Sequence, residues 1–106
     1  MSGDNRPWSE QFRLAAKAWV ELDNAANMLE ESKSAVLSQR IAAQGDMPFN
    51  RAEMAVKGSP EWRDYIKSMV DARSAANLKK VQMEYLRMKF SEWQSFEANK
   101  RHEARL

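Results

Sequence analysis

The chain of 106 residues contains no cysteine and a single histidine, His102. The absence of cysteine excludes disulfides, thiolate metal ligands and thiol nucleophiles together. A lone histidine in a charged segment cannot supply the ligand spacing of a zinc site, and the Glu-x-x-His pairs of a di-iron bundle are missing. Glycine-rich phosphate loops and nucleophile elbows are missing as well. We therefore predict no catalytic residue, no metal, no cofactor and no small-molecule substrate, so the protein is not expected to be an enzyme.

Glycine, proline and long apolar runs are also scarce. The chain has three glycines and three prolines, and 43% of its residues are hydrophobic, which is enough for a core and argues against disorder. No apolar run approaches the roughly 20 residues that cross a bilayer, and the N-terminus lacks the apolar segment of a signal peptide. We expect a protein of the reducing cytoplasm with no membrane partner.

The residues that are common favour helices. Alanine, glutamate, lysine, arginine, methionine and glutamine are strong helix formers and recur along the whole chain. No stretch alternates apolar and polar residues as a half-buried strand would. A chain of this length is enough for one small domain, so we predict a single all-α domain.

The first long helix is expected over about 9–44, because no glycine or proline interrupts the chain between Pro7 and Gly45. Ser9 is the expected N-cap, since its hydroxyl can accept from a free N–H of the first turn. Gly45 suits the left-handed conformation that often follows a helix.

A connector with a short helix of its own is expected over about 45–58. Asn50 is a good N-cap and Glu53 follows three residues later, as in a capping box. Phe49 and Met54 then occupy the positions of a hydrophobic staple.

The last helix is expected over about 60–102, with Ser59 as its N-cap and Pro60 at its first position. Two long helices of similar length joined by a compact connector predict an antiparallel helical hairpin with coiled-coil-like packing. The sequence leaves open whether the helices pair within one chain or swap between chains.

The large apolar residues of the last helix do not keep to one side. One partner helix can bury only one stripe, so the surplus predicts association, either of copies of this chain into a helical bundle or with another protein. The first stripe comprises Trp62, Ile66, Met69, Ala76, Met83, Leu86, Phe90 and Trp93, and the second comprises Leu78, Val81, Tyr85 and Met88, with Phe96 near its end.

Basic residues border the apolar positions of the same helix. Arg73, Lys80 and Arg87 recur every seven residues and so line up along the helix, while Lys79 and Lys89 add charge nearby. A solvated edge with local ion pairs is one interpretation. The functional interpretation is a ridge that follows a phosphate backbone, with aromatic rings nearby for stacking.

Two segments, "ELDNAANMLEESKSAVLSQRIAAQGDMPFNRAEMAVKGSPEW" and "ARSAANLKKVQMEYLRMKFSEWQSFEANKRHEARL", resemble small helical proteins encoded in phage and prophage genomes. The stretch "KKVQMEYLRMKF" also has a weak similarity to the T4-type recombination mediators. The first resemblance implies a phage accessory protein inside a bacterial host cell, and the second implies a helical oligomer that binds single-stranded DNA.

Two hypotheses of function follow. In the first, the protein is a non-catalytic homo-oligomer of phage DNA metabolism that binds single-stranded DNA or a recombination or replication protein, with the five basic residues on phosphate. In the second, it is a protein-binding module that inhibits a host enzyme or defence system through the second apolar stripe. Steep weakening of binding with salt is expected of the first hypothesis and not of the second.

Overall fold

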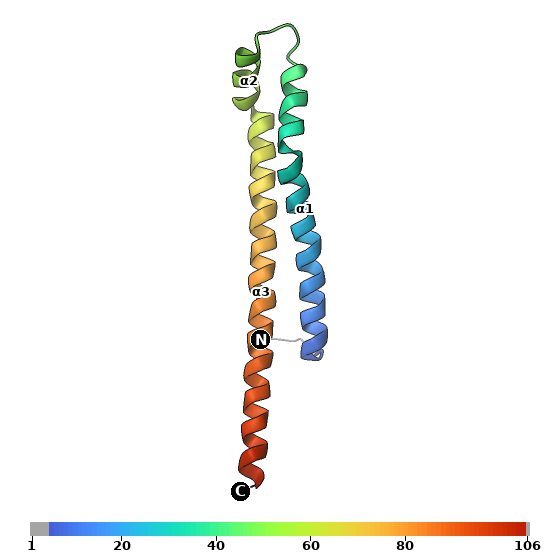
Figure 1. Ribbon diagram of the computed structural model, residues 1–106, viewed down its shortest axis with the longest axis vertical. Helices are drawn as coiled ribbons and strands as arrows, with labels where there is room; N and C mark the ends of the chain where they lie inside the picture. The colour runs from blue at the N-terminus through green and yellow to red at the C-terminus, as the bar shows by residue number, and fades with distance from the viewer. Residues whose placement is uncertain (1–4, 106) are drawn as a thin grey trace.

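The computed structural model describes residues 5–105, which form an antiparallel hairpin of two long helices with a short helix at its closed end (Figure 1). The helices are α1 (Trp8–Ala42), α2 (Phe49–Lys57) and α3 (Pro60–Arg105), and no strand occurs among the described residues. The predicted all-α hairpin is confirmed. The principal extents are 84 × 23 × 18 Å, so the molecule is a rod.

The two long helices differ in length, and this leaves one end of α3 without a partner helix. α1 has 35 residues and α3 has 46, or about 52 Å and about 69 Å at 1.5 Å per residue. Figure 1 shows the C-terminal part of α3 continuing beyond the first turn of α1. α3 ends three residues later than predicted, and α1 ends two residues earlier.

The chain reverses after α1 through a turn that ends at Gly45. The Gln44 N–H donates to the Ile41 carbonyl at 3.1 Å and the Gly45 N–H donates to the Ala42 carbonyl at 3.2 Å. Gly45 has φ +81°, so the predicted left-handed glycine is present, although it follows a further turn residue rather than the helix itself.

Prolines cap α1 and α2, in place of the predicted polar residues. Pro7 and Pro48 are the N-cap residues, and neither helix receives a hydrogen bond from a capping side chain. The proline ring fixes φ near −65°, and Pro48, with φ −55° and ψ 141°, holds the extended backbone of an N-cap. Asn50 therefore lies inside the first turn of α2, and Ser9 inside that of α1.

The predicted hydrophobic staple is not formed either. Phe49 is the first residue of α2 and is 63% exposed, and Met54 is 75% exposed. The buried face of α2 instead comprises Ala52 and Val56. The prediction placed the start of α2 too late. Phe49 and Met54 therefore do not occupy the positions of a staple, and both side chains are exposed to solvent.

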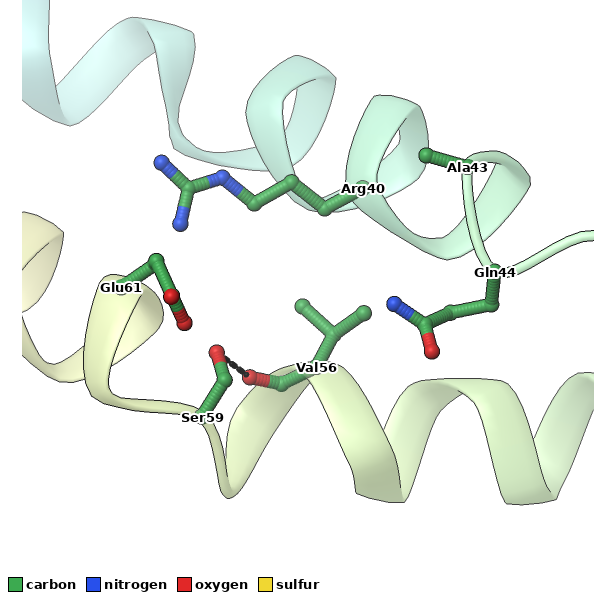
Figure 2. Close-up of a pocket in the computed structure, with 6 residues that line it drawn as sticks. All are labelled: Arg40, Ala43, Gln44, Val56, Ser59 and Glu61. Carbon is green, nitrogen blue, oxygen red and sulfur yellow. Dashed lines mark hydrogen bonds between the residues drawn. The ribbon is translucent and has the colours of Figure 1, made fainter.

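Ser59 caps α3 as predicted and also holds the junction with α2. Its hydroxyl accepts from the Trp62 N–H at 3.2 Å and donates to the Val56 carbonyl at 2.6 Å, the bond drawn in Figure 2. Trp62 anchors this first turn of α3, since it is buried and stacks on Tyr65 with 5.5 Å between ring centroids.

The core lies along the seam between α1 and α3 and is narrow. Most of the first predicted stripe of α3 is buried or half-buried against α1, but its last member, Trp93, is largely exposed. Two alanines on the seam have no exposed surface: Ala26, near the middle of α1, and Ala76, in the first half of α3. Within residues 5–105, no helix is long and apolar enough to span a membrane.

Candidate protein and nucleic-acid interface

An exposed apolar stripe runs along α3 on the side opposite the seam. We call Leu78, Val81, Tyr85 and Met88 the outer stripe; these side chains are 55–61% exposed. Their spacing of three, four and three residues places them on one side of the helix. The structure brings these four predicted interface residues together and leaves them without a partner helix.

Phe96, the fifth predicted interface residue, belongs to a different surface. It is exposed, but it lines a groove with Trp8, Lys89 and Trp93 at the open end of the hairpin. This groove lies beside the start of α1, where α3 begins to extend past it. Phe96 is therefore at the edge of the seam rather than on the outer stripe.

The area exposed by the hairpin is large for its mass. The described chain exposes 8301 Å², whereas a compact protein of 12.3 kDa exposes about 6,100 Å². The radius of gyration is 23.2 Å, against about 13 Å for a compact domain of this length. The rod shape accounts for this excess, and the outer stripe is an apolar part of it.

The structure gives Arg73 a role other than the predicted phosphate contact. Its guanidinium donates to Asp23 at 2.6 Å, to Asn27 at 2.6 Å, and to both carboxylate oxygens of Glu30 at 2.8 and 2.9 Å. All three acceptors belong to α1, and the Arg73 side chain is 29% exposed. Its donors are therefore directed at α1 rather than at solvent.

This network perturbs both of its principal charges. The hydrogen bond from Arg73 lowers the pKa of Glu30 below its ordinary value of 4.5. The hydrogen bonds to Glu30 and Asp23 raise the pKa of Arg73. The heptad position alone did not reveal the network, but Asp23, Asn27 and Glu30 at four- and three-residue spacing were a signal for it.

The other four predicted basic residues carry no ion pair within the described part of the chain. They lie on two flanks of the hairpin rather than on one. Lys80 and Arg87 follow Arg73 at seven-residue spacing, and Lys80 Nζ lies 6.0 Å from the centroid of the Trp19 ring. Arg87 lines an apolar groove of about 330 Å³ together with Trp8 and Phe12.

The opposite flank carries Lys79 and Lys89. Lys79 lines a groove with Tyr85 and with Gln11 and Leu14 of α1, and Lys89 Nζ lies 6.0 Å from the centroid of the Tyr85 ring. Residues 78–105 hold seven lysines and arginines and four carboxylates, a difference of +3. The open end of the hairpin is therefore the basic end.

A notch at the closed end contains a buried side-chain donor that has no partner within residues 5–105. It has a volume of about 260 Å³, and Figure 2 shows Arg40 of α1 facing Glu61 of α3 across it. Arg40 Nη1 is buried without a hydrogen-bond partner among these residues. The Ser59 hydroxyl, also in the notch, is held in the cap of α3.

Within the described residues, no group of three or more histidine, cysteine or carboxylate side chains could hold a metal ion. Comparisons of the chain with protein-family models, with curated proteins and with solved structures return no match. The fold and its surfaces define the class of protein: an all-α helical hairpin with an exposed apolar stripe and a basic open end.

Proposed function

We propose that this protein is a non-catalytic, homo-oligomeric helical module of phage DNA metabolism, which binds single-stranded DNA or a recombination or replication protein in the cytoplasm of a bacterial cell. The observation that carries the proposal is the set of cations at the open end of the hairpin. Lys79, Lys80, Arg87 and Lys89 have no ion pair within residues 5–105, and the rings of Trp93 and Phe96 are exposed beside Lys89. The phage setting depends on the sequence resemblance.

A surface that binds single-stranded nucleic acid needs two elements: cations that are not already in ion pairs, and exposed aromatic rings. Cations release counterions from the phosphate backbone, and aromatic faces stack on bases without regard to sequence. Arg73 is left out of this set because its donors are directed at α1. Four phosphate contacts per chain correspond to a salt slope of about −2.8, or about a 50-fold loss of affinity between 50 and 200 mM salt.

The test is a titration of fluorescently labelled single-stranded DNA by anisotropy at several salt concentrations, with the native mass recorded in the same buffers. We expect salt-dependent binding, and Lys80→Ala and Arg87→Ala should each reduce the magnitude of the slope by about 0.7. Lys57→Ala is the matched control, because Lys57 lies in α2 at the closed end and pairs with Glu53 at 3.8 Å. Flat anisotropy at every salt concentration would rule out the DNA-binding form of the proposal.

A second candidate is the protein-binding module that inhibits a host enzyme or defence system. The exposed outer stripe favours it, since apolar stripes of this kind mark protein interfaces. This candidate predicts no DNA binding and a protein complex that depends little on salt. The same titration therefore separates the two candidates.

A further inference from the structure

The outer stripe is centred on α3. Its four residues run from Leu78 to Met88, so their midpoint is residue 83, and α3 runs from Pro60 to Arg105, with its midpoint between residues 82 and 83. A second α3 packed antiparallel about this midpoint covers the outer stripe and overlaps the helix along its full length. If the stripe lay nearer one end of α3, the two α3 helices would overlap only in part, and each would extend beyond the other.

The antiparallel arrangement also gives the unpartnered end of α3 a neighbour. The C-terminal part of α3 extends beyond α1 (Figure 1), and the antiparallel register places residues 94–105 beside residues 61–72 of the second copy. α1 packs on the other side of α3, so it does not obstruct the approach. Two hairpins joined in this way form a row of four long helices, with the two α3 helices in the middle and one α1 helix on each side.

Charges that continue the line of the outer stripe distinguish antiparallel from parallel pairing. In a parallel pair each residue meets its own copy, so Asp64, Lys67, Asp71 and Glu92 all face like charges. Like charges placed opposite each other oppose association. In the antiparallel pair every one of these contacts is between unlike residues: Asp64 with His102, Lys67 with Asn99, Asp71 with Ser95, and Ser74 with Glu92.

We propose that the occupant of the outer stripe is a second copy of this chain, with its α3 antiparallel, so that Leu78 faces Met88 and Val81 faces Tyr85 of the second copy. The area of this face is sufficient. A contact along the whole of α3, about 69 Å long and about 10–12 Å wide, covers about 700–800 Å² per partner, close to the roughly 800 Å² per partner of a stable interface. This inference specifies the homo-oligomer of the proposed function and does not depend on DNA binding.

The absence of cysteine makes disulfide trapping a clean test. Leu78→Cys and Met88→Cys chains are unfolded together, refolded and oxidised in a glutathione buffer, and the cross-linked products are separated by mass. We expect the mixed Leu78→Cys/Met88→Cys product to predominate. Met28→Cys, an exposed position on α1, is the control for random oxidation and should give little cross-linked product.

Two results would overturn the inference. Predominant cross-linking of each variant with itself would show parallel pairing. A native mass of one chain for the unmodified protein, at concentrations where its helical content is intact, would show that no second copy is bound, and this reading needs no variant. Neither result concerns DNA, so failure here leaves the anisotropy test of the proposed function standing.

Discussion

Arg73 contributes to the pairing of α1 with α3 rather than to the basic surface that the sequence predicted. It shares its seven-residue spacing with Lys80 and Arg87, yet it lies between three acceptors of α1 while the other two are free of ion pairs among the described residues. An exposed ion pair contributes little to stability. A guanidinium that bonds two carboxylates and an amide in one network is better placed, because its planar fork loses less freedom per bond. We therefore assign Arg73 to the pairing of α1 with α3.

Replacing Arg73 by methionine tests this assignment. Arg73→Met keeps an unbranched apolar stem but leaves Asp23 and Glu30 without their shared cation, so we expect a lower melting temperature at neutral pH. The measurement is thermal unfolding followed by circular dichroism at a fixed protein concentration. Arg13→Met is the control, since it removes an exposed ion pair with Glu10 that lies within α1; an equal loss in both variants would contradict the assignment.

The pH dependence of this difference follows from the sign of the shift at Glu30. Its pKa in the folded protein lies below the ordinary value of 4.5. The stabilisation is therefore complete above pH 4.5 and is lost as the pH falls through the lower folded-state pKa. We expect the melting temperatures of the wild type and Arg73→Met to converge below that pH. A difference that grows on acidification would show that Glu30 is not the group involved.

At the scale of elements, the junction between α2 and α3 depends on Ser59. Its hydroxyl bonds the last turn of α2 and the first turn of α3 at once. Ser59→Ala removes the cap, and loss of an N-cap serine costs about 1 kcal/mol, which is about 5 °C in melting temperature for a domain of this size. Ser9→Ala is the matched control, because α1 has no side-chain cap, and it should leave the melting temperature unchanged. Equal effects of the two substitutions would contradict this account.

The three helices could be predicted from the sequence because individual glycine, serine and proline residues mark where helices end and begin. Gly45 reverses the chain, and Ser59 with Pro60 starts α3. The caps of α1 and α2 were wrong, because Ser9 and Asn50 match the N-cap preference as well as any residue, whereas a preceding proline sets the backbone without a side-chain bond. Residue preferences alone do not decide whether the N-cap is the polar residue or the proline that precedes it.

The candidate surfaces were predicted unevenly for a related reason. The outer stripe depends only on spacing within one helix, so four of the five predicted interface residues lie together on it, and Phe96 alone belongs to another surface. The role of Arg73 depends on which residues of α1 lie opposite it. That alignment is set by the connector between α1 and α3, and no pattern within either helix contains it.

At the scale of the whole molecule, the proposed antiparallel pairing would determine on which face of the dimer each of the four cations without an ion pair lies. In the proposed dimer, Lys80 and Arg87 of both copies lie on one face, and Lys79 and Lys89 of both copies lie on the other. Each face then carries four cations around the twofold axis, because each of the two chains contributes two cations to each face. The proposed dimer therefore concentrates basic charge at its centre.

Glu84 lies between Lys80 and Arg87 on one flank of the outer stripe, one residue from the twofold axis at residue 83. It therefore approaches its own copy on that face of the dimer, as Gln82 does on the opposite face. In a parallel dimer, Glu84 would lie beside Lys89 of the second copy. We therefore expect Glu84→Gln to strengthen the dimer, and Gln82→Glu, the matched substitution, to weaken it. Exposed charge pairs contribute about 0.2–1 kcal/mol, so each change in Kd should be at most about fivefold.

Sedimentation equilibrium at low and high salt measures both variants against the wild type, and salt should reduce both differences because it screens exposed charges. If Glu84→Gln instead weakens the dimer, Glu84 has lost a cationic neighbour and the copies are parallel. If neither substitution changes Kd, the axis does not pass through the middle of α3. The cations on each face would then belong to one chain, and the proposed DNA-binding surface would have to form without the second copy.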